Sequence, residues 1–318
     1  LDEAIADAKE RLTGQKTVRA KEESEKKKEA QKAAKSTAES QKAKSTDDTD
    51  PARLKRKLPV LETTGASGTT DKSGTANSIL KDEIGNLNQI TGFVPDDSVA
   101  KSVTITYRPE STVYVAERYG VFYEDDTWKD IEHSGKDDEE EMWEHMEDYL
   151  SCPTDLQKLT RYYIEEIGGI DGEWKDSKSE IEAIRKKILW ELAVYDTEPG
   201  ATPAGKDFVE YFLFENRKGF CVHFASAGTL LFRLAGKEAR YAEGYAVPAS
   251  AFEEQEDGTY QAQISGAMGH AWCQVWCLDD GYWENVEVTP PAGIEQIQKS
   301  VEEMKGDWQE FYTRMQAG

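Results

Sequence analysis

The pattern of apolar and polar positions divides the chain into two parts. The N-terminal part has no apolar helix or strand face, whereas in the C-terminal part apolar residues recur at helical or strand spacing. From Thr13 to Ser45 the residues are almost all Lys, Glu, Ala, Gln and Ser, and Val18 is the one sizeable apolar side chain. Such a segment is predicted to be a solvated single helix or disordered. Residues 63–76 are rich in Thr, Ser and Gly, which is typical of a flexible linker. We therefore expect a charged arm over residues 1–58 and a linker over residues 59–76.

Order is expected from about residue 77. Residues 102–123 are rich in β-branched and tyrosine side chains and predict two or three strands, so we assign residues 77–135 to a small β-rich subdomain. Helical spacing of apolar residues follows over residues 154–167, 179–195 and 207–214, with Tyr195 on the buried face of the second segment. A further helix is predicted from Phe220 to Leu234, and Gly236 should end it.

After Gly236 the period of the pattern changes to two. Residues 240–247, 260–264, 270–278 and 282–288 predict antiparallel strands, with a hairpin turn at residues 256–258. A closing helix is expected over residues 294–315. Helices first and strands afterwards favour an α+β domain, which we place at residues 136–318.

Charge is distributed unevenly along this chain of net charge −23. Residues 1–58 carry 16 basic and 12 acidic side chains, which leaves 23 basic and 50 acidic side chains in the rest. Such an acidic body repels phosphates, so nucleic acid is excluded as a partner. No run of about 20 apolar residues is present, so the sequence predicts no membrane span. Because the chain begins at Leu1 without a methionine, we expect a fragment or a processed product.

The acidic run from Asp137 to Glu141 precedes an apolar helical pattern. Acidic residues at the start of a helix favour the helix dipole, and this is our interpretation. A calcium site is the alternative, but the regular ligand spacing of a calcium loop is absent.

The four cysteines do not predict a disulfide framework. Cys273 and Cys277 lie four residues apart in one predicted strand, which separates their Cα atoms by about 13 Å, against a limit of roughly 7 Å for a bridge.

Cys221 follows Gly219 and Phe220 and opens a predicted helix. A thiol in this place lies near the positive end of the helix dipole, which favours the thiolate. The glycine allows the backbone to approach closely. Taken alone, a cysteine in this place is more often a small buried residue than a nucleophile.

His270 and Glu287 lie in consecutive predicted strands. Alternation places His270 and Trp272 on one face of the first strand, and the small apolar residues, among them Cys273, on the other, which we interpret as core. Glu287 shares a face with Asn285. If the strands pair, its carboxylate can reach the distal imidazole nitrogen, fix the tautomer and stabilise the imidazolium. A hydrogen-bonded surface histidine and an edge-strand glutamate are the alternatives.

Together, a cysteine on a helix, a histidine on a strand and an acid on the next strand resemble the transglutaminase-like superfamily. The matching segments are residues 219–227, 231–241, 244–245, 269–272 and 283–290. The resemblance covers roughly residues 205–291, and the upstream strands and residues 207–214 are most similar to the extracytoplasmic domain of bacterial membrane-anchored members. Two departures are Glu287, where aspartate is usual, and Gln274, where an acidic residue is usual. Residues 1–76 have no part in the resemblance.

The resemblance implies a papain-like α+β core in which the cysteine-bearing helix packs on an antiparallel sheet. It implies thiol-dependent acyl transfer on a protein or peptide substrate, with Cys221 as nucleophile, His270 as general base and Glu287 orienting the histidine. No metal or organic cofactor is needed. The parent protein should be anchored in a bacterial membrane, with this domain on the extracytoplasmic side.

Several points stay open at this stage. The thioester can pass to an amine or to water, and a cysteine peptidase or a non-catalytic cell-envelope binding module on the same fold are the alternatives. The backbone N–H of Cys221 is a natural oxyanion donor, and Tyr211 is suggested as the second. His223, about 200° round the same helix from Cys221, is interpreted as structural.

Overall fold

The structure, a computed structural model, describes residues 60–63, 85–93, 99–133, 136–168, 181–186, 191–277, 281–291 and 293. Residues 59–318 form one compact unit. The expectations for the arm over residues 1–58, for most of the linker and for the helix over residues 294–315 fall outside the described residues.

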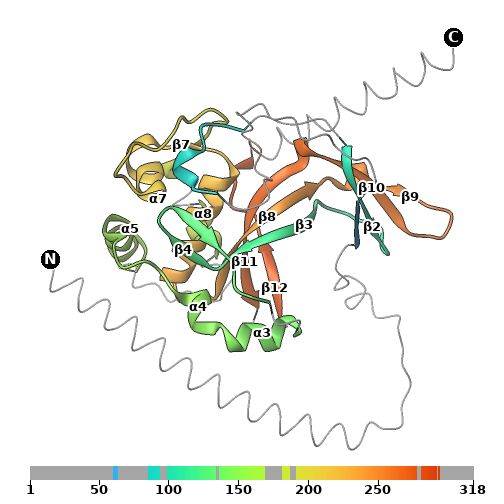
Figure 1. The fold of residues 1–318 in the computed structure, drawn as a ribbon, viewed down its shortest axis with the longest axis horizontal. Helices are drawn as coiled ribbons and strands as arrows, with labels where there is room; N and C mark the ends of the chain where they lie inside the picture. Colours follow the sequence, from blue (N-terminus) through green and yellow to red (C-terminus); the bar gives the residue numbers. More distant parts are fainter. Residues whose placement is uncertain are drawn as a thin grey trace, which may run out of the picture. The chain divides into compact units, whose positions relative to one another are not determined.

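Two four-stranded sheets with antiparallel pairing carry most of the β structure among the described residues (Figure 1). The first has the order β1-β2-β10-β9, with strands Val60–Thr63, Val99–Ile105, Tyr260–Ser265 and Glu253–Glu254. The second has the order β12-β11-β8-β3, with strands Tyr282–Val286, Gly269–Cys277, Ala239–Val247 and Val113–Gly120. The predicted antiparallel strands and the α+β class are confirmed.

Two short ladders and several helices complete the described structure. Strands β4 (Phe122–Glu124) and β5 (Thr127–Lys129) form a hairpin, and β6 (Val194–Tyr195) runs parallel to β7 (Lys218–Gly219). The α-helices are α3 (Asp138–Glu144), α4 (Met146–Leu150), α5 (Gln157–Tyr162), α7 (Phe208–Tyr211) and α8 (Cys221–Leu234). Short 3₁₀ or π segments are η1 (Leu87–Gln89), η2 (Tyr163–Gly168), η4 (Phe212–Asn216), η5 (Ala249–Ala251) and η6 (Gly266–Met268).

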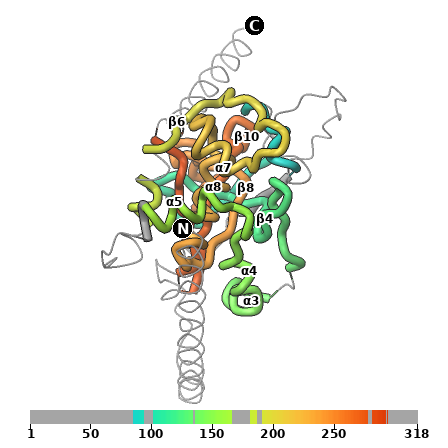
Figure 2. Tube along the Cα trace, turned by 90° about the vertical axis from the view of Figure 1, so that its left-hand side faces the viewer, coloured from blue at the N-terminus to red at the C-terminus, as the bar shows by residue number. Residues whose placement is uncertain are grey.

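Helix α8 lies at the centre of the main apolar core, and α7 packs beside it in both views (Figure 1, Figure 2). All 14 residues of α8 are buried. One face of β11 packs against this helix through Ala271, Cys273 and Val275, as the alternation predicted. The Cys273 thiol donates to the Ala225 carbonyl over 3.3 Å, and burial raises its pKa to about 12. Cys273 is therefore an inert core residue.

The expected β-rich subdomain over residues 77–135 is instead interleaved with the rest of the unit. Strand β2 pairs with β10 and β3 pairs with β8, so both sheets mix strands from before and after residue 136. A second apolar cluster joins the two sheets through Val103 of β2, Val115 of β3 and Ile264 of β10. Residues 60–63, inside the expected linker, form β1 and cover the free edge of β2. These pairings are long-range, so local composition could not indicate them.

One predicted helix ends earlier than expected. Residues 181–186 and 191–192 are helical, but Tyr195, expected on the helical face, lies in β6. The backbone N–H of Val194 donates to Arg217 and that of Asp196 donates to Gly219, at 2.9 and 2.8 Å. This parallel pairing replaces the last helical turn and carries Tyr195 to the turn that precedes Cys221.

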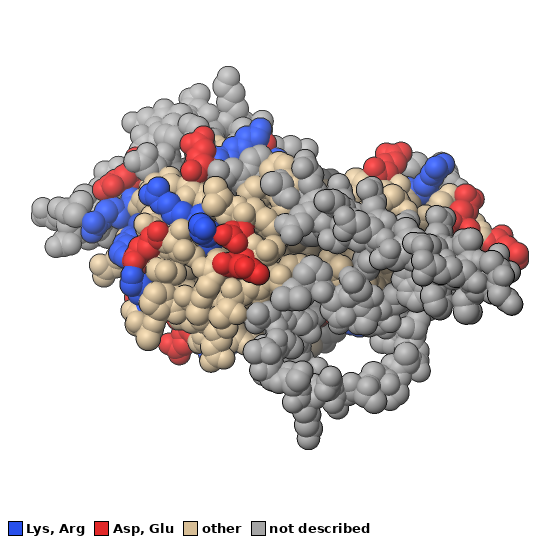
Figure 3. Space-filling view, turned by 90° about the horizontal axis from the view of Figure 1, so that it is seen from above, with Lys and Arg blue, Asp and Glu red and all other residues tan. Residues whose placement is uncertain are grey.

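The remaining sequence expectations concern cysteines, membrane spans and surface charge. All four cysteines lie within the described residues, and none of them forms a disulfide there. Among the described helices, none combines the length and the apolar character that crossing a bilayer requires. On the face drawn in Figure 3, acidic and basic side chains lie interspersed among uncharged areas.

Candidate active site

The turn from β7 into α8 places Cys221 at the first position of the helix. Phe220 is extended, with φ −119° and ψ −172°. At Gly219 an added Cβ would lie 2.6 Å from the His223 side chain and 2.8 Å from the Phe212 ring, so only glycine fits this close approach. The N–H groups of the first helical turn point out of the helix end, where the dipole is positive. The sequence prediction for Cys221 at a helix start is confirmed.

His223 is a core residue, as interpreted from the sequence. Its side chain lies among the rings of Phe208, Phe212 and Phe220, and its Nδ1 accepts from the Phe220 N–H at 3.4 Å. Burial lowers its pKa to about 3, so the ring is neutral at physiological pH.

His270 lies near the start of β11, opposite Gly244 of β8, and its side chain is fully buried. Its Nε2 lies 2.7 Å from Glu287 Oε2. Its Nδ1 has no hydrogen bond of normal geometry among the described residues. Burial alone would lower the pKa of His270, but the Glu287 carboxylate and then the Cys221 sulfur raise it to about 10. The imidazole ring is therefore charged at neutral pH and interacts electrostatically with both Glu287 and Cys221.

Glu287 lies just past the end of β12 and receives three donors. His270 Nε2 and the Tyr114 hydroxyl both contact Oε2, at 2.7 and 2.6 Å, and the Thr289 N–H donates to Oε1 over 2.7 Å. Burial opposes the charge of this carboxyl, but the His270 imidazolium and these hydrogen bonds hold its pKa below the ordinary value. The predicted contact between the acid and the distal imidazole nitrogen is present.

An aromatic layer covers this face of the sheet. The Tyr114 ring lies 5.0 Å from the Trp272 ring and 6.2 Å from the His270 ring, measured between centroids. Trp272 Nε1 donates to Asn285 Oδ1, which also accepts from Gln274. Tyr114 could not be predicted as part of the site from the sequence, because its strand lies 173 residues before Glu287 and the two come together only through sheet pairing.

Tyr195 also lies near the thiol. Burial, followed by the charges of Cys221 and Glu287, raises the pKa of its hydroxyl, which therefore stays protonated. Tyr211, the suggested oxyanion donor, instead packs its ring beneath Lys206, with Nζ 5.1 Å from the ring centroid. Cys221 itself is only 1% exposed, so a substrate can reach its sulfur only when neighbouring side chains move.

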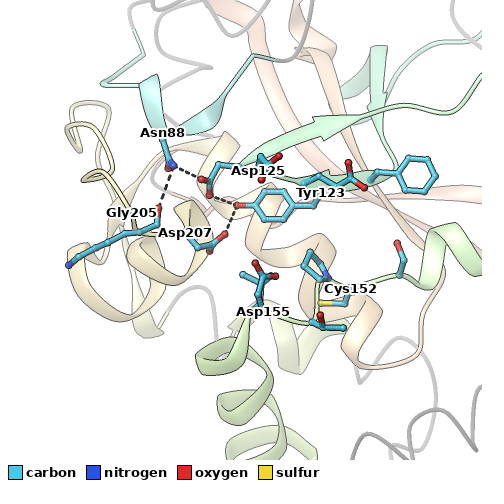
Figure 4. A pocket seen from close by; sticks show the side chains of 15 residues that line it. Asn88, Tyr123, Asp125, Cys152, Asp155, Gly205 and Asp207 are labelled. Atoms are coloured by element: carbon cyan, nitrogen blue, oxygen red, sulfur yellow. Dashed lines mark hydrogen bonds between the residues drawn. The ribbon is translucent and has the colours of Figure 1, made fainter.

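A cavity of about 870 Å³ opens elsewhere on the described surface (Figure 4). It is bordered by the β4–β5 turn, residues 151–156 and residues 205–207. The Tyr123 hydroxyl lies 2.9 Å from Asp207 and 3.2 Å from Asp126 at its wall. None of the three predicted site residues lines this cavity. Over the described part of the chain, no group of three or more His, Cys, Asp or Glu side chains is arranged to hold a metal ion.

Residues 169–288, which include Cys221, His270 and Glu287, match the model of the transglutaminase-like superfamily. The match covers this segment, which is less than half of the chain. Over 128 residues, 40% of the chain, it is 33% identical to a protein-glutamine gamma-glutamyltransferase of Pseudomonas aeruginosa. Over 113 residues, 34% of the chain, it is 30% identical to protein YebA of Bacillus subtilis.

The chain spans only 18% and 15% of the lengths of these two relatives. Among solved structures it is similar to the periplasmic domain of TgpA from Pseudomonas aeruginosa, at 18% identity and a TM-score of 0.41. That match covers 79% of this chain and 95% of the TgpA domain. The family-model match over residues 169–288 confirms the transglutaminase-like resemblance that the motifs predicted, at the level of the superfamily.

Proposed function

We propose that this domain is an enzyme that transfers acyl groups from protein or peptide amides through a thioester on Cys221. The proposal rests mainly on the contacts of the His270 ring. This ring is hydrogen-bonded to Glu287 and also interacts electrostatically with the Cys221 sulfur. Further support comes from the relative named a protein-glutamine gamma-glutamyltransferase.

In the first step, the Cys221 thiolate attacks the carbonyl carbon of the amide. The His270 imidazolium gives its proton to the leaving nitrogen as the C–N bond breaks, which releases ammonia or an amine and leaves a thioester. In the second step, an amine or a water molecule attacks the thioester, His270 takes the proton, and the sulfur leaves as thiolate. Glu287 keeps the imidazole oriented through both steps. The N–H groups at the start of α8 offer donors to the oxyanion.

The identity of the acceptor distinguishes transglutamination from hydrolysis. Incubation with a glutamine-containing peptide should release ammonia and, if a primary amine is added, yield a peptide whose mass reports the new amide. Cleavage of the peptide backbone would instead favour the cysteine peptidase alternative. A non-catalytic cell-envelope module predicts neither product.

We predict that Cys221 is the most reactive thiol of the folded protein. Iodoacetamide at about pH 6 should label Cys221 first when the neighbouring side chains move aside, because among the described thiols this one has a histidine–carboxylate pair beside it. Half-buried Cys152 and Cys277 serve as internal references, and Cys273 should remain unlabelled until the protein unfolds. Peptide mass spectrometry after timed quenching gives the four rates in one sample.

The matched variant is His270→Asn, which should slow the labelling of Cys221 about 10-fold or more and leave the rates of Cys152 and Cys277 unchanged. Equal rates for Cys221 in both proteins would show that His270 does not activate the thiol.

We also propose that the domain lies on the extracytoplasmic side of the membrane. In that case, a membrane-impermeant thiol reagent applied to whole cells should label Cys221. Labelling of Cys221 only after cell lysis would contradict that location.

A further inference from the structure

Tyr114 contacts the proposed catalytic group without taking part in the chemistry outlined above. It lies in β3, separated from β12 by β8 and β11. Its hydroxyl donates to Glu287 Oε2 over 2.6 Å, and His270 Nε2 contacts the same oxygen at 2.7 Å. The tyrosine and the imidazole therefore share one carboxylate oxygen.

The surroundings hold the Tyr114 ring in place. Its ring lies 5.0 Å from that of the fully buried Trp272 at an interplanar angle of 51°, and Trp272 is itself bonded to Asn285. Burial and then the charge of Glu287 raise the pKa of the Tyr114 hydroxyl, so it remains a hydrogen-bond donor over the whole pH range in which a thiol enzyme is active. The hydroxyl is a fixed donor rather than a group that exchanges protons with the site.

We infer that Tyr114 is a positioning residue, whose hydroxyl holds the Glu287 carboxylate where it can orient His270. This inference rests on the proposed function, because the orientation of His270 affects turnover only if Cys221 is the nucleophile. It adds a fourth side chain to the site, from a strand outside the segment that matches the family model.

Other charged or titratable groups also interact with Glu287. They are His270 of β11, Arg185 of the segment 181–186, Tyr195 of β6 and, through electrostatics alone, Cys273 of β11. Arg185 Nη1 donates to the backbone carbonyl of Glu287 over 3.4 Å. Removing the Tyr114 hydroxyl would take one of the three donors from the carboxylate and leave the hydrogen bonds from His270 and the Thr289 N–H. Because the charged carboxylate loses one donor, the pKa of Glu287 should rise. As the pH is lowered, the variant should therefore lose activity at a higher pH than the unaltered protein does.

The test is Tyr114→Phe, which keeps the ring on Trp272 and removes only the hydroxyl. We expect kcat on a glutamine-containing peptide to fall about 10- to 100-fold, as for a lost hydrogen bond to a charged group, with KM unchanged. The acid limb of the pH profile should move upward. In ¹³C NMR, the Glu287 side-chain carboxyl should titrate at a higher pH than in the unaltered protein.

Tyr119→Phe is the matched control, since Tyr119 lies on the same strand and packs under Arg240, 3.7 Å from its ring centroid. It should leave kcat and the Glu287 titration unchanged. If Tyr114 acts through Glu287, adding Tyr114→Phe to Glu287→Gln should cause no further loss of kcat. Should Tyr114→Phe fail to fold, 3-fluorotyrosine at position 114 keeps the shape and strengthens the donor, and it should move the Glu287 titration downward.

The two kinds of failure are distinguishable. A Glu287 titration and a kcat that are unchanged in a folded Tyr114→Phe protein would overturn the positioning role. Absence of turnover in the unaltered protein on every amide tested would overturn the proposed function, while the NMR titration would still report whether Tyr114 controls Glu287.

Discussion

Glu287 shows how one side chain can be held by groups from distant parts of the chain. Three donors surround its carboxylate, from His270, from Tyr114 and from the Thr289 backbone. Glutamate is one methylene longer than the aspartate usual in the resemblance, and here the residue lies just beyond the last residue of β12. The bond from Thr289 closes a local turn that fixes the second carboxylate oxygen.

We predict that Glu287→Gln lowers turnover of a glutamine-containing peptide by about 10²- to 10³-fold. The neutral amide would present an N–H group where donors now converge, so it cannot orient the imidazolium. Loss of that orientation lowers kcat about 10⁴-fold in a serine triad, and a thiolate–imidazolium pair should depend on it less. Glu287→Asp should retain more activity, because it keeps the charge. Steady-state kinetics on the three proteins, with circular dichroism to confirm folding, provide the measurement.

Full activity in Glu287→Gln would show that another group holds His270. Asn285, on the same strand face, is already bonded to Trp272 and Gln274, so the structure offers it no simple way to take over.

At the scale of elements, the site depends on how closely β3 approaches β8. Gly244 of β8 pairs with His270 on one side and with Ala116 of β3 on the other. A Cβ added at Gly244 would lie 1.9 Å from the Val115 carbonyl oxygen. The absence of a side chain at this one position therefore lets β3, which carries Tyr114, lie close to β8, which is the neighbour of the strand that carries His270.

We expect Gly244→Ala to destabilise the domain by about 2–3 kcal/mol, since the backbone of β3 must move away from β8. Turnover should fall as well, because Tyr114 moves with β3. Urea unfolding followed by tryptophan fluorescence measures the first effect. Gly85→Ala is the control, because nothing lies within 4 Å of a Cβ added there. Equal stability of both variants would refute the close-approach argument.

At the scale of the whole molecule, a neutral histidine in the main core makes stability depend on pH. His223 has an ordinary pKa near 6.5 in the unfolded chain, and burial lowers it to about 3 in the folded protein. The unfolded state thus binds one more proton between these values. Stability from this group is present above pH 6.5 and is lost as the pH falls toward 3, by at most about 1.4 kcal/mol per pH unit.

The expected result is that His223→Asn flattens the acid side of the stability curve, although the smaller side chain lowers stability at every pH. The measurement is the unfolding free energy from urea titrations at several pH values between 4 and 7, compared by slope. His133→Asn is the control, because its ring is exposed and contacts Glu141 of α3. This variant should lose stability with falling pH as steeply as the unaltered protein does. Parallel curves for His223→Asn and the unaltered protein would exclude His223 as the source.

The elements that carry the proposed triad could be predicted from sequence because their signals are local, whereas the roles of the three residues were predicted from the resemblance of the surrounding motifs. Cys221 follows a glycine at the start of an apolar helical period, and His270 and Glu287 lie in consecutive segments of period two. Helical and strand periods are imposed by backbone geometry within a few residues, so they show in a single sequence. The antiparallel pairing of β11 with β12 then follows from their short connection, and the contact between His270 and Glu287 follows from that pairing.

Only the tertiary structure decided the contacts that join distant segments. Tyr114 reaches Glu287 across 173 residues, Tyr195 leaves its predicted helix to pair beside Gly219, and Val60–Thr63 add a strand to a sheet completed by residues 260–265. Strand order and register are set by the total burial of both sheet faces rather than by any local preference, because one strand can pair equally well with many others until the core is formed. The amino-acid pattern therefore determined the elements that carry Cys221, His270 and Glu287, whereas packing decided which side chains surround these three residues.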